Sequence, residues 1–519
     1  MSRGVTTADL GGEWRELDRR SPAVTALLVA GIALGAAVPM FVSTRDDGVP
    51  ATLLLPLGAV GILALAGLAA IGDRVRWRHT RYRVTDERVE LRFSWVVHRL
   101  RSVPRDRIRT VDLTANPLLR LFGVVKVQIG TGQQSGDKTH LVLSPLERRV
   151  AERLRAELLD RTETPETPAA AAPEPPAAGP EVIAALDWSW IRYAPVSVTT
   201  PIIGSAAFGG LLQVSEWFGL QETVMGRIGD FLGERPLAIT IAILVAVGVI
   251  IGVLGSLALF VELWRGYRLT RESGLLRVHR GLLTTRSLSL DERRLRGVEV
   301  AEPLGARLIG GARVDAVATG LRVRGGDERS DPRTLLPAAP RALAHDVAAE
   351  IVREPVSPTR SARLCPHPRA ARGRRLRWAI GAVLLISGGL ALLGTLLSDV
   401  LLDLAVLTAV AGLPVAVALA LDAYRNLGHG ITGEYLVTRH GTVSRHTIAL
   451  QRAGVIGWTI TSSPFQRRAG LLTLNATTAA NRGSYPVYDV GEGDGLAFAD
   501  EAVPGLLTPF LERADVTSA

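Results

Sequence analysis

The sequence predicts a polytopic α-helical membrane protein in which three two-helix hairpins alternate with three strand-rich domains. Two observations carry this prediction. Long apolar blocks without charge come in three pairs, and the segments that follow the pairs resemble one another. Mean hydropathy over the 519 residues is +0.22 although 21% of them are charged, so the apolar residues must be concentrated in blocks. This composition excludes an intrinsically disordered chain.

The first pair of apolar blocks runs from Pro22 to Val42 and from Ala51 to Ile71, and each block has 21 residues without a charge. At about 1.5 Å per residue, such a helix crosses a hydrocarbon core about 30 Å thick. The two later pairs are similar, so we predict transmembrane hairpins at residues 22–71, 194–261 and 378–421. Gly31-x-x-x-Gly35 and Gly248-x-x-x-Gly252 predict close packing of helices within the chain.

Arginine gathers at one end of the predicted hairpins. The loops inside the hairpins are poor in basic residues, whereas the segments outside them are rich in arginine. The positive-inside rule then predicts a multi-pass protein of the cytoplasmic (inner) membrane, with both termini and all long segments in the cytoplasm. Its nearest partner is the lipid bilayer, and the basic residues predicted to lie closest to the anionic leaflet are Arg74, Arg76, Arg78, Arg81, Arg372, Arg374 and Arg375.

A threefold repeat follows the hairpins. Similar openings stand at Tyr82-Arg-Val-Thr85, Tyr267-Arg-Leu-Thr270 and Tyr435-Leu-Val-Thr438. Each copy later has a proline, an arginine and a glycine in order: Pro117, Arg120, Gly123; Pro303, Arg307, Gly310; Pro464, Arg467, Gly470. We therefore predict domains at residues 73–161, 265–354 and 423–519, the last of them divergent. The remaining segments are a cytoplasmic tail (1–21), a Pro/Ala-rich linker (162–187) and a basic linker (355–377).

Each domain is predicted to consist mostly of strands and to end in a helix. Residues 82–92 alternate apolar and polar side chains, as a half-buried strand does. In the first copy, Ser144 to Glu147 resembles a helix-starting capping box, and Leu146, Val150, Leu154 and Leu158 form an apolar stripe. In the third copy, Pro504 and Pro509 predict a short or broken helix.

The repeat resembles a known family. The Tyr-x-Val-Thr opening, the Pro-x-Asp-Arg-Ile element at Pro104 to Ile108 and the Leu-x-Arg-x-x-Gly element at Leu118 to Gly123 are similar to those of bacterial pleckstrin-homology-like membrane proteins of the YdbS/YdbT type. The resemblance implies that each cytoplasmic domain is a pleckstrin-homology-like barrel closed by a C-terminal helix. It also implies a role in envelope maintenance or envelope stress, and it brings no catalytic residues.

Motifs for catalysis or for a cofactor are not found in the sequence. Asp137 stands where a phosphate-binding loop needs glycine before Lys138. The nine histidines are scattered, and Cys365 is the single cysteine, so no set of metal ligands has the required spacing. We therefore expect a protein that is not an enzyme and that has no cofactor and no metal site.

The net charge of +10 leaves binding to an anionic partner as the functional hypothesis. Arg92, Arg99 and Arg101 frame the turn between the first two predicted strands, where related eukaryotic domains hold lipid headgroups. Ordinary surface arginine is the alternative reading of these three residues. Nucleic acid is not expected, because no basic face interleaved with aromatic residues is present. The sequence leaves two functions open: a scaffold that binds protein partners, anionic headgroups or other copies of itself, and a transporter or lipid-handling protein that uses the six helices.

Overall fold

The computed structural model describes residues 13–46, 50–95, 98–105, 108, 110–130, 141–159, 180–197, 199–217, 220, 223, 226, 229, 237–272, 274–319, 321, 331, 333–480 and 483–510. The chain divides into two compact units, Met1–Arg293 and Arg294–Ala519, each of which is described by itself. The boundary between the units falls inside the second predicted domain, residues 265–354.

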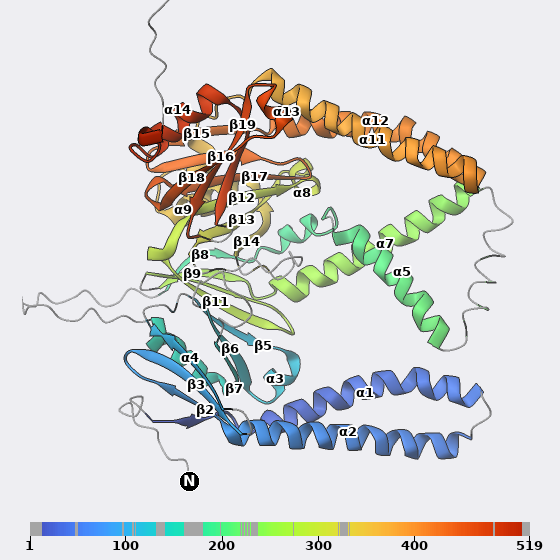
Figure 1. Ribbon diagram of the computed structural model, residues 1–519. Coiled ribbons are helices and arrows are strands. Elements are labelled where there is room, and N and C mark those ends of the chain that lie inside the picture. Colours follow the sequence, from blue (N-terminus) through green and yellow to red (C-terminus); the bar gives the residue numbers. More distant parts are fainter. Residues whose placement is uncertain are drawn as a thin grey trace, which may run out of the picture. The chain divides into compact units, whose positions relative to one another are not determined.

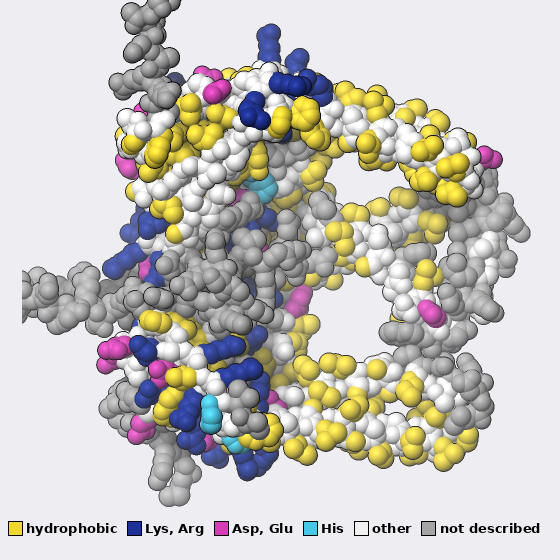
Figure 2. All heavy atoms as spheres, viewed as in Figure 1, with side chains coloured by type: hydrophobic (Ala, Val, Ile, Leu, Met, Phe, Trp, Pro, Cys, Tyr) yellow, Lys and Arg dark blue, Asp and Glu magenta, His cyan; other side chains and the backbone are white. Residues whose placement is uncertain are grey.

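Six apolar helices form three neighbouring pairs (Figure 1). The pairs are α1 (Ser21–Asp46) with α2 (Ala51–His79), α5 (Thr199–Trp217) with α7 (Leu237–Trp264), and α11 (Arg369–Leu397) with α12 (Asp399–Arg425). Among the described residues, α2, α7, α11 and α12 are long and apolar enough to cross a membrane. Hydrophobic side chains cover the surfaces of the paired helices, whereas basic side chains gather over the strands (Figure 2). The chain is thus a multi-pass membrane protein, as the sequence predicts.

The first unit holds two antiparallel sheets. A four-stranded sheet has the order β1-β2-β3-β4, and a seven-stranded sheet has the order β7-β6-β5-β11-β10-β9-β8. The strands of the first sheet are β1 (Arg15–Glu16), β2 (Thr80–Val84), β3 (Arg88–Ser94) and β4 (His98–Pro104). The second sheet comprises β5 (Thr110–Ala115), β6 (Val124–Gly130), β7 (Leu141–Glu147), β8 (Glu181–Ala185), β9 (Arg268–Glu272), β10 (Leu275–Arg280) and β11 (Thr285–Asp291).

The second unit repeats this pattern. A six-stranded sheet has the order β14-β13-β12-β17-β16-β15, and a three-stranded sheet has the order β18-β19-β20. The strands of the larger sheet are β12 (Leu295–Pro303), β13 (Gly311–Ala318), β14 (Thr334–Pro340), β15 (Gly428–Thr432), β16 (Tyr435–His440) and β17 (Ser444–Gln451). The smaller sheet comprises β18 (Val455–Thr461), β19 (Leu471–Thr478) and β20 (Ser484–Gly491).

Consecutive repeats share their sheets. Strand β5 of the first repeat pairs with β11 of the second, and β12 of the second pairs with β17 of the third. The described strands therefore form open sheets, and three separate closed barrels, which the family resemblance implies, are not what the structure shows. The physical reason is that the backbone groups at the edge of one repeat find their hydrogen-bond partners in the next repeat instead of in their own.

The third copy of the sequence motif is displaced by one strand. Tyr82 lies in β2 and Tyr267 directly precedes β9, so both belong to the first strand after a hairpin. Tyr435 instead begins β16, the second strand of its repeat. The first strand there is β15, which carries glycine and histidine in place of the motif. The alignment of Tyr435 with Tyr82 is therefore wrong, although the domain itself is present.

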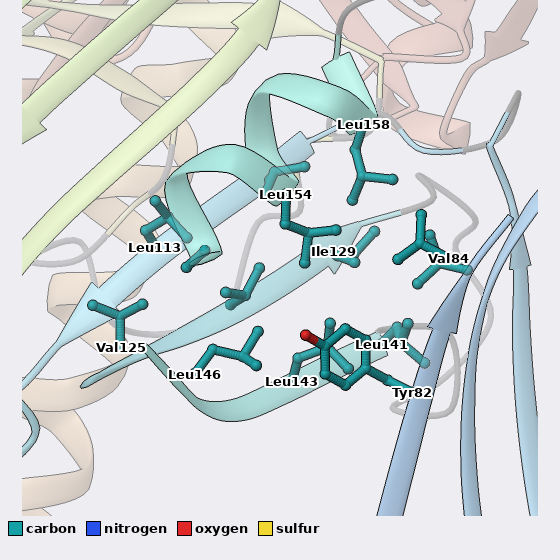
Figure 3. Close-up of a cluster of buried hydrophobic side chains, with 14 of the residues drawn as sticks. Tyr82, Val84, Leu113, Val125, Ile129, Leu141, Leu143, Leu146, Leu154 and Leu158 are labelled. Carbon is teal, nitrogen blue, oxygen red and sulfur yellow. The ribbon is translucent and has the colours of Figure 1, made fainter. Parts of the chain in front are cut away.

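A hydrophobic core fills the first repeat (Figure 3). Leu154 and Leu158 project into it from α4 (Arg148–Leu159), opposite Tyr82, Ile129 and other side chains of the strands. The helix begins at Arg148, because Ser144 to Glu147 still belong to β7. The predicted capping box is therefore wrong, whereas two of the leucines in the predicted apolar stripe do face the core from the helix.

The two later repeats also end in helices. In the second repeat α9 (Arg341–Val352) packs on β12, β13 and β14. In the third repeat α14 (Glu492–Ala502) is short and ends before Pro504, as the prolines predict. Phe498 and Ala499 of α14 join a core that includes Leu474 and Val487.

Segments ahead of the hairpins return to the sheets. In the first two repeats β1 pairs with β2 and β8 pairs with β9, so residues 181–185 of the predicted linker 162–187 form a strand. In the third, the Cys365 amide donates to the His429 carbonyl at 2.8 Å, and α10 (Pro358–Ser361) lies in the predicted linker 355–377. The glycine-rich segment after Gly130, with Asp137 and Lys138, lies outside the described residues.

Candidate anion-binding site

The described part of the first unit contains a basic pocket of about 500 Å³. It lies where the first repeat meets the first strands of the second repeat, next to the pairing of β5 with β11. Six arginines and one acidic residue, Glu152, contribute to its wall. The arginines are Arg120, Arg148, Arg155, Arg268, Arg277 and Arg286. Such an excess of guanidinium groups creates a positive potential that favours an anion.

Regular secondary structure positions these side chains. On α4, Arg148, Glu152 and Arg155 follow the helical spacing of one face, while Leu154 and Leu158 face the core. On β10, Arg277 and His279 alternate with the buried residues Leu276 and Val278. Because the arginines stand on elements whose opposite faces are buried, the pocket is built on rigid scaffold elements rather than on loops.

Arg155 is the most informative residue of the pocket. Its side chain is buried, and its Nη1 donates to the Ser287 hydroxyl at 2.9 Å. No carboxylate of the described residues lies within ion-pair distance of it. Burial lowers the pKa of Arg155, and the neighbouring Arg277 lowers it further. The carboxylates of Glu152 and Glu272 act in the opposite direction and raise this pKa, to a smaller extent. A buried guanidinium without an ion pair costs free energy, which a bound anion would offset.

Neighbouring acidic residues neutralise part of the positive charge of the pocket. Arg277 pairs with Glu272 at 3.1 Å, and Arg148 pairs with Glu152 at 3.0 Å, so two of the arginines are partly neutralised. Burial lowers the pKa of His279, and the nearby arginines, Arg148 first, lower it further. His279 is therefore neutral at physiological pH and can serve as a hydrogen-bonding group of the wall.

One end of the pocket lies close to the start of α1 and the end of α7. Arg120 stands on α3 (Pro117–Leu121) and donates from Nη1 to the Leu282 carbonyl at 2.7 Å. The turn that contains Leu282 is held by Glu262, near the end of α7, which accepts from the amides of Leu283 and Thr284 at 3.0 and 2.9 Å. Arg20, just ahead of α1, donates to the Phe122 carbonyl at 2.6 Å.

The predicted headgroup residues lie elsewhere, on the β3–β4 hairpin. Arg92, Arg99 and Arg101 are all exposed, and none of them lines the pocket. Arg92 is opposite Leu100, whereas Arg99 and Arg101 are opposite Phe93 and Leu91. Because side chains alternate along a strand, Arg99 and Arg101 share one face and Arg92 lies on the other. The structure therefore brings together two of these three residues, and their role in headgroup binding stays a prediction.

The basic residues after the first hairpin stay at the surface. Arg74, Arg76 and Arg78 are exposed at the end of α2, and Arg81 is exposed on β2. Arg76 pairs with Asp73 at 2.8 Å, and Arg81 pairs with Glu16 at 3.3 Å.

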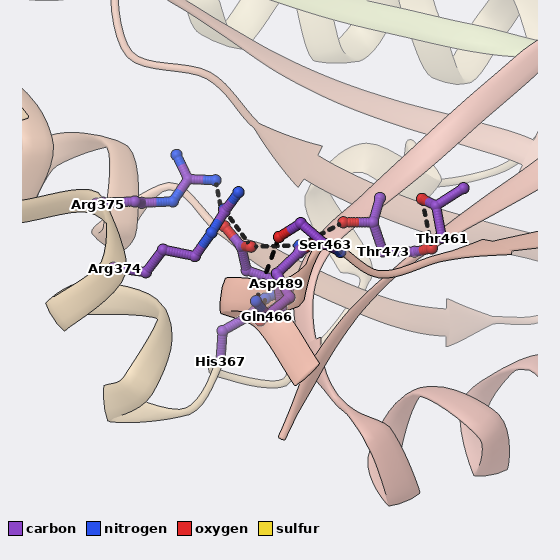
Figure 4. A network of polar contacts seen from close by, with 8 residues as sticks. All are labelled: His367, Arg374, Arg375, Thr461, Ser463, Gln466, Thr473 and Asp489. Atoms are coloured by element: carbon purple, nitrogen blue, oxygen red, sulfur yellow. Dashed lines mark hydrogen bonds and ion pairs between the residues drawn. The ribbon is translucent and has the colours of Figure 1, made fainter. Parts of the chain in front are cut away.

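The basic residues before the third hairpin have different surroundings (Figure 4). Arg372 is exposed near the start of α11. Arg374 and Arg375 instead donate to the buried carboxylate of Asp489 at 2.6 and 3.2 Å. Gln466 donates to the same carboxylate at 2.9 Å. Arg374 and Arg375 therefore hold the third domain to a membrane helix, which is a structural role that charge counting along the sequence does not reveal.

Sequence reasoning missed the pocket because its residues come from distant segments. Arg148 and Arg155 stand on α4, while Arg268, Arg277 and Arg286 stand on three strands of the next repeat. No short motif contains them. The only available signal was the alternation of Arg277 and His279 with apolar residues along one strand. Among the described residues, no group of three or more His, Cys, Asp or Glu side chains is placed to hold a metal ion.

Comparison with known proteins supports the assignment of transmembrane helices and bacterial PH domains. Residues 25–162 and 383–498 match the bacterial PH domain family, and these segments correspond to the first and third repeats. The chain is 24% identical over 285 residues to the transmembrane protein YdbT of Bacillus subtilis strain 168. That match covers 53% of this chain and 56% of YdbT, so the chain spans little more than half the length of that relative. No solved structure matches the chain. These two matches confirm the predicted resemblance to bacterial pleckstrin-homology-like membrane proteins of the YdbS/YdbT type.

Proposed function

We propose that this protein is a non-catalytic, membrane-anchored binding protein that holds an anionic lipid headgroup in the pocket around Arg155. The observation that carries the proposal is the buried Arg155 guanidinium, which has no carboxylate partner among the described residues and is surrounded by further arginines. A phosphate group matches such a set of guanidinium donors in charge and in geometry.

The position of the pocket favours a lipid as the source of the phosphate. Arg120 and the Leu282 turn lie beside the bases of the first two hairpins, through their contacts with Phe122 and Glu262. A headgroup of the cytoplasmic leaflet would reach this end of the pocket without leaving the membrane surface. In a protein of this family, headgroup binding would report on the state of the membrane, which agrees with the proposed role in envelope maintenance or stress.

The rival proposal, transport through the helices, needs polar groups that face a common cavity. The hydroxyls of Ser215, Ser256 and Ser387 instead donate to carbonyls three residues earlier in their own helices. Their hydrogen bonds are thus met locally. This pattern supports a binding function in the strand-rich domains over one in the helices.

The test uses the full chain purified in detergent and measures binding of three probes by calorimetry. The probes are short-chain phosphatidylglycerol, short-chain phosphatidylcholine and inorganic phosphate. We expect the anionic lipid to bind and the variant Arg155→Gln to bind it about tenfold more weakly, because one charged hydrogen bond contributes roughly 1.5 kcal/mol or more. Arg153→Gln removes the same charge from an exposed position on the same helix and is the matched control.

The results distinguish a lipid ligand from a soluble anion, and the pocket from the β3–β4 hairpin. Equal binding of inorganic phosphate and of the anionic lipid would identify a soluble anion as the ligand and reject the lipid. Equal affinities of the Arg155 and Arg153 variants would reject the pocket. Loss of binding in a variant with Arg92, Arg99 and Arg101 all changed to Ala, while Arg155→Gln still binds, would move the site to the β3–β4 hairpin. The full chain is needed because the second repeat supplies one wall of the pocket.

A further inference from the structure

Consecutive repeats are connected by a pair of strands, one from each repeat, which we call a joint. Two strand edges of the kinds that pair in these joints have no neighbouring strand among the described residues. In each joint, the strand just before the repeat's short helix (β5 or β12) pairs with the third strand of the following repeat (β11 or β17). In the first repeat the third strand, β4, is the last described strand of its sheet. In the third repeat the strand before the short helix, β18, is the last described strand of its sheet. Among the described strands, these two edges are the free counterparts of the joints.

The registers of the two joints fix which residues correspond. One position is equivalent in the strands before the three short helices: it is occupied by Leu113, Val300 and Ile460. In each repeat this residue pairs with the residue that stands four positions after the glycine that follows the short helix. Across the joints, Leu113 is opposite Ser287, and Val300 is opposite Thr447. Ser287 and Thr447 each stand four residues before the end of their strand, which is the place of Leu100 in β4. Ile460 is therefore equivalent to Leu113 and Val300, and Leu100 is equivalent to Ser287 and Thr447. Neither Ile460 nor Leu100 has such a partner on a neighbouring described strand.

Burial at these positions shows what the joint contributes. Leu113 is 8% exposed and Val300 is 1% exposed, and each lies on a strand that a strand of the neighbouring repeat flanks. Ile460, at the same position in the third repeat, is 45% exposed, and Leu100 is 61% exposed. Two large apolar side chains thus remain in solvent at the places where the joint would bring them together.

We propose that copies of this protein assemble head to tail, with β18 of one copy pairing antiparallel with β4 of the next in the register of the internal joints. Ile460 then lies opposite Leu100, Trp458 opposite Ser102, and Thr459 opposite Arg101. The pairing continues the sheet by strand addition, in which backbone hydrogen bonds supply affinity and the facing side chains supply register. The proposal is independent of the anion-binding pocket.

The charges on the two strands favour this pairing over pairing of like edges. β4 carries Arg99 and Arg101, which would face like charges if two β4 strands met. β18 has no charged residue, whereas edge strands that stay free usually carry charge. When β18 of one copy pairs with β4 of the next, the first copy still has its β4 edge and the second still has its β18 edge. Further copies can therefore add at both ends, and the assembly either extends or closes into a ring. Because every repeat is attached to a membrane hairpin, the assembly grows in the plane of the membrane.

Cysteine cross-linking of the full chain in membranes tests the proposal. In a Cys365→Ser background, cells co-express two differently tagged copies, one with Ile460→Cys and one with Leu100→Cys. We expect oxidation to give a dimer that carries both tags. The register control replaces Leu100→Cys with Arg101→Cys, whose side chain points to the opposite face. A second experiment measures co-purification of two differently tagged copies, one of which carries both Ile460→Lys and Leu100→Lys. Phe510→Lys, at an exposed position in the same unit as Ile460, is the control.

Two results would overturn the proposal. The first is a mixed dimer that forms no better with Leu100→Cys than with Arg101→Cys. The second is a dimer from Ile460→Cys alone that accounts for all the cross-linked protein, because it would mean that two β18 strands pair with each other. Co-purification that is lost in the double Lys variant and retained in Phe510→Lys would support the proposal independently of the cross-link.

Discussion

Arg374 donates to the buried carboxylate of Asp489 at 2.6 Å, and this bond joins the N-terminal part of α11 to a strand of the third repeat. Arg375 and Gln466 contact the same carboxylate. Asp489 has a φ of 54°, in the left-handed region, which aspartate and asparagine adopt more readily than most residues. One carboxylate therefore balances two arginines at the junction of membrane helix and domain.

The first prediction concerns this carboxylate. Asp489→Asn keeps the size and the backbone preference of the side chain but leaves Arg374 and Arg375 without their counter-ion. Since removing one partner of a buried ion pair costs about 3–5 kcal/mol, we expect a loss of about 3 kcal/mol in the free energy of unfolding. Chemical denaturation of the purified chain in detergent measures it. Asp494→Asn removes the same charge from an exposed position and should cost less than about 1 kcal/mol; equal losses would contradict the structural role of Asp489.

A second prediction concerns pH and the buried pair of His367 and His429. Their ring nitrogens Nε2 and Nδ1 are 3.0 Å apart, so the two rings share one proton and cannot both be charged without repulsion. Burial, together with His367, lowers the pKa of His429 from 6.5 to about 4, and burial lowers the pKa of His367 as well. Between pH 6.5 and about pH 4, the unfolded chain therefore binds more protons than the folded chain. The stabilisation is complete above pH 6.5 and is lost as the pH falls towards 4.

For His429 alone the loss amounts to about 3 kcal/mol, since one pKa unit corresponds to about 1.4 kcal/mol. Thermal unfolding at pH 7.0, 5.5 and 4.5 should show the decrease in the unchanged chain. His429→Gln, which cannot gain a proton, should show a smaller decrease over the same range. Parallel pH profiles for the two proteins would mean that His429 is not the group that titrates.

A third prediction concerns glycines in the membrane helices. A Cβ atom on Gly252 would lie 2.4 Å from the Thr200 carbonyl oxygen of α5, whereas a Cβ on Gly35 meets nothing within 4 Å. Gly252→Leu should therefore force α5 and α7 apart and cost about 1–3 kcal/mol or more. Gly35→Leu should leave stability close to that of the unchanged chain. Thermal unfolding in detergent compares the two, and similar unfolding temperatures would argue against close packing at Gly252.

The sequence was sufficient to predict what depends on local pattern. Uncharged apolar blocks predicted the helices. The close-packing motif is confirmed at Gly252, where a Cβ would lie 2.4 Å from the Thr200 carbonyl oxygen, and the Gly248 carbonyl oxygen would lie 2.4 Å from a Cβ on Gly204 of α5. The corresponding motif at Gly31 and Gly35 makes no such contact in the chain. A spacing of four residues marks one face of a helix, but it does not say whether another helix lies against that face.

The joints between repeats and the basic pocket could not be predicted because they depend on contacts between distant residues. Leu113 and Ser287 are opposite each other across a joint, yet nothing in either strand alone distinguishes pairing within a repeat from pairing with the next one. In the sequence, Arg155 has the pattern of an exposed helical residue. In the structure its side chain is buried and donates to Ser287 of β11. For the same reason the sequence pattern around Tyr435 resembles the opening of a repeat although it lies one strand too late.

The pairing of β5 with β11 also has a consequence for biosynthesis. The seven-stranded sheet needs residues from 110 to 291, and the apolar helices α5 and α7 lie between its two halves in the sequence. A nascent chain that has completed its first repeat therefore has an unpaired β5 edge until α5, α7 and β11 have been translated. A chain whose translation stops before Asp291 leaves that edge exposed, as incompletely folded chains expose unpaired strand edges.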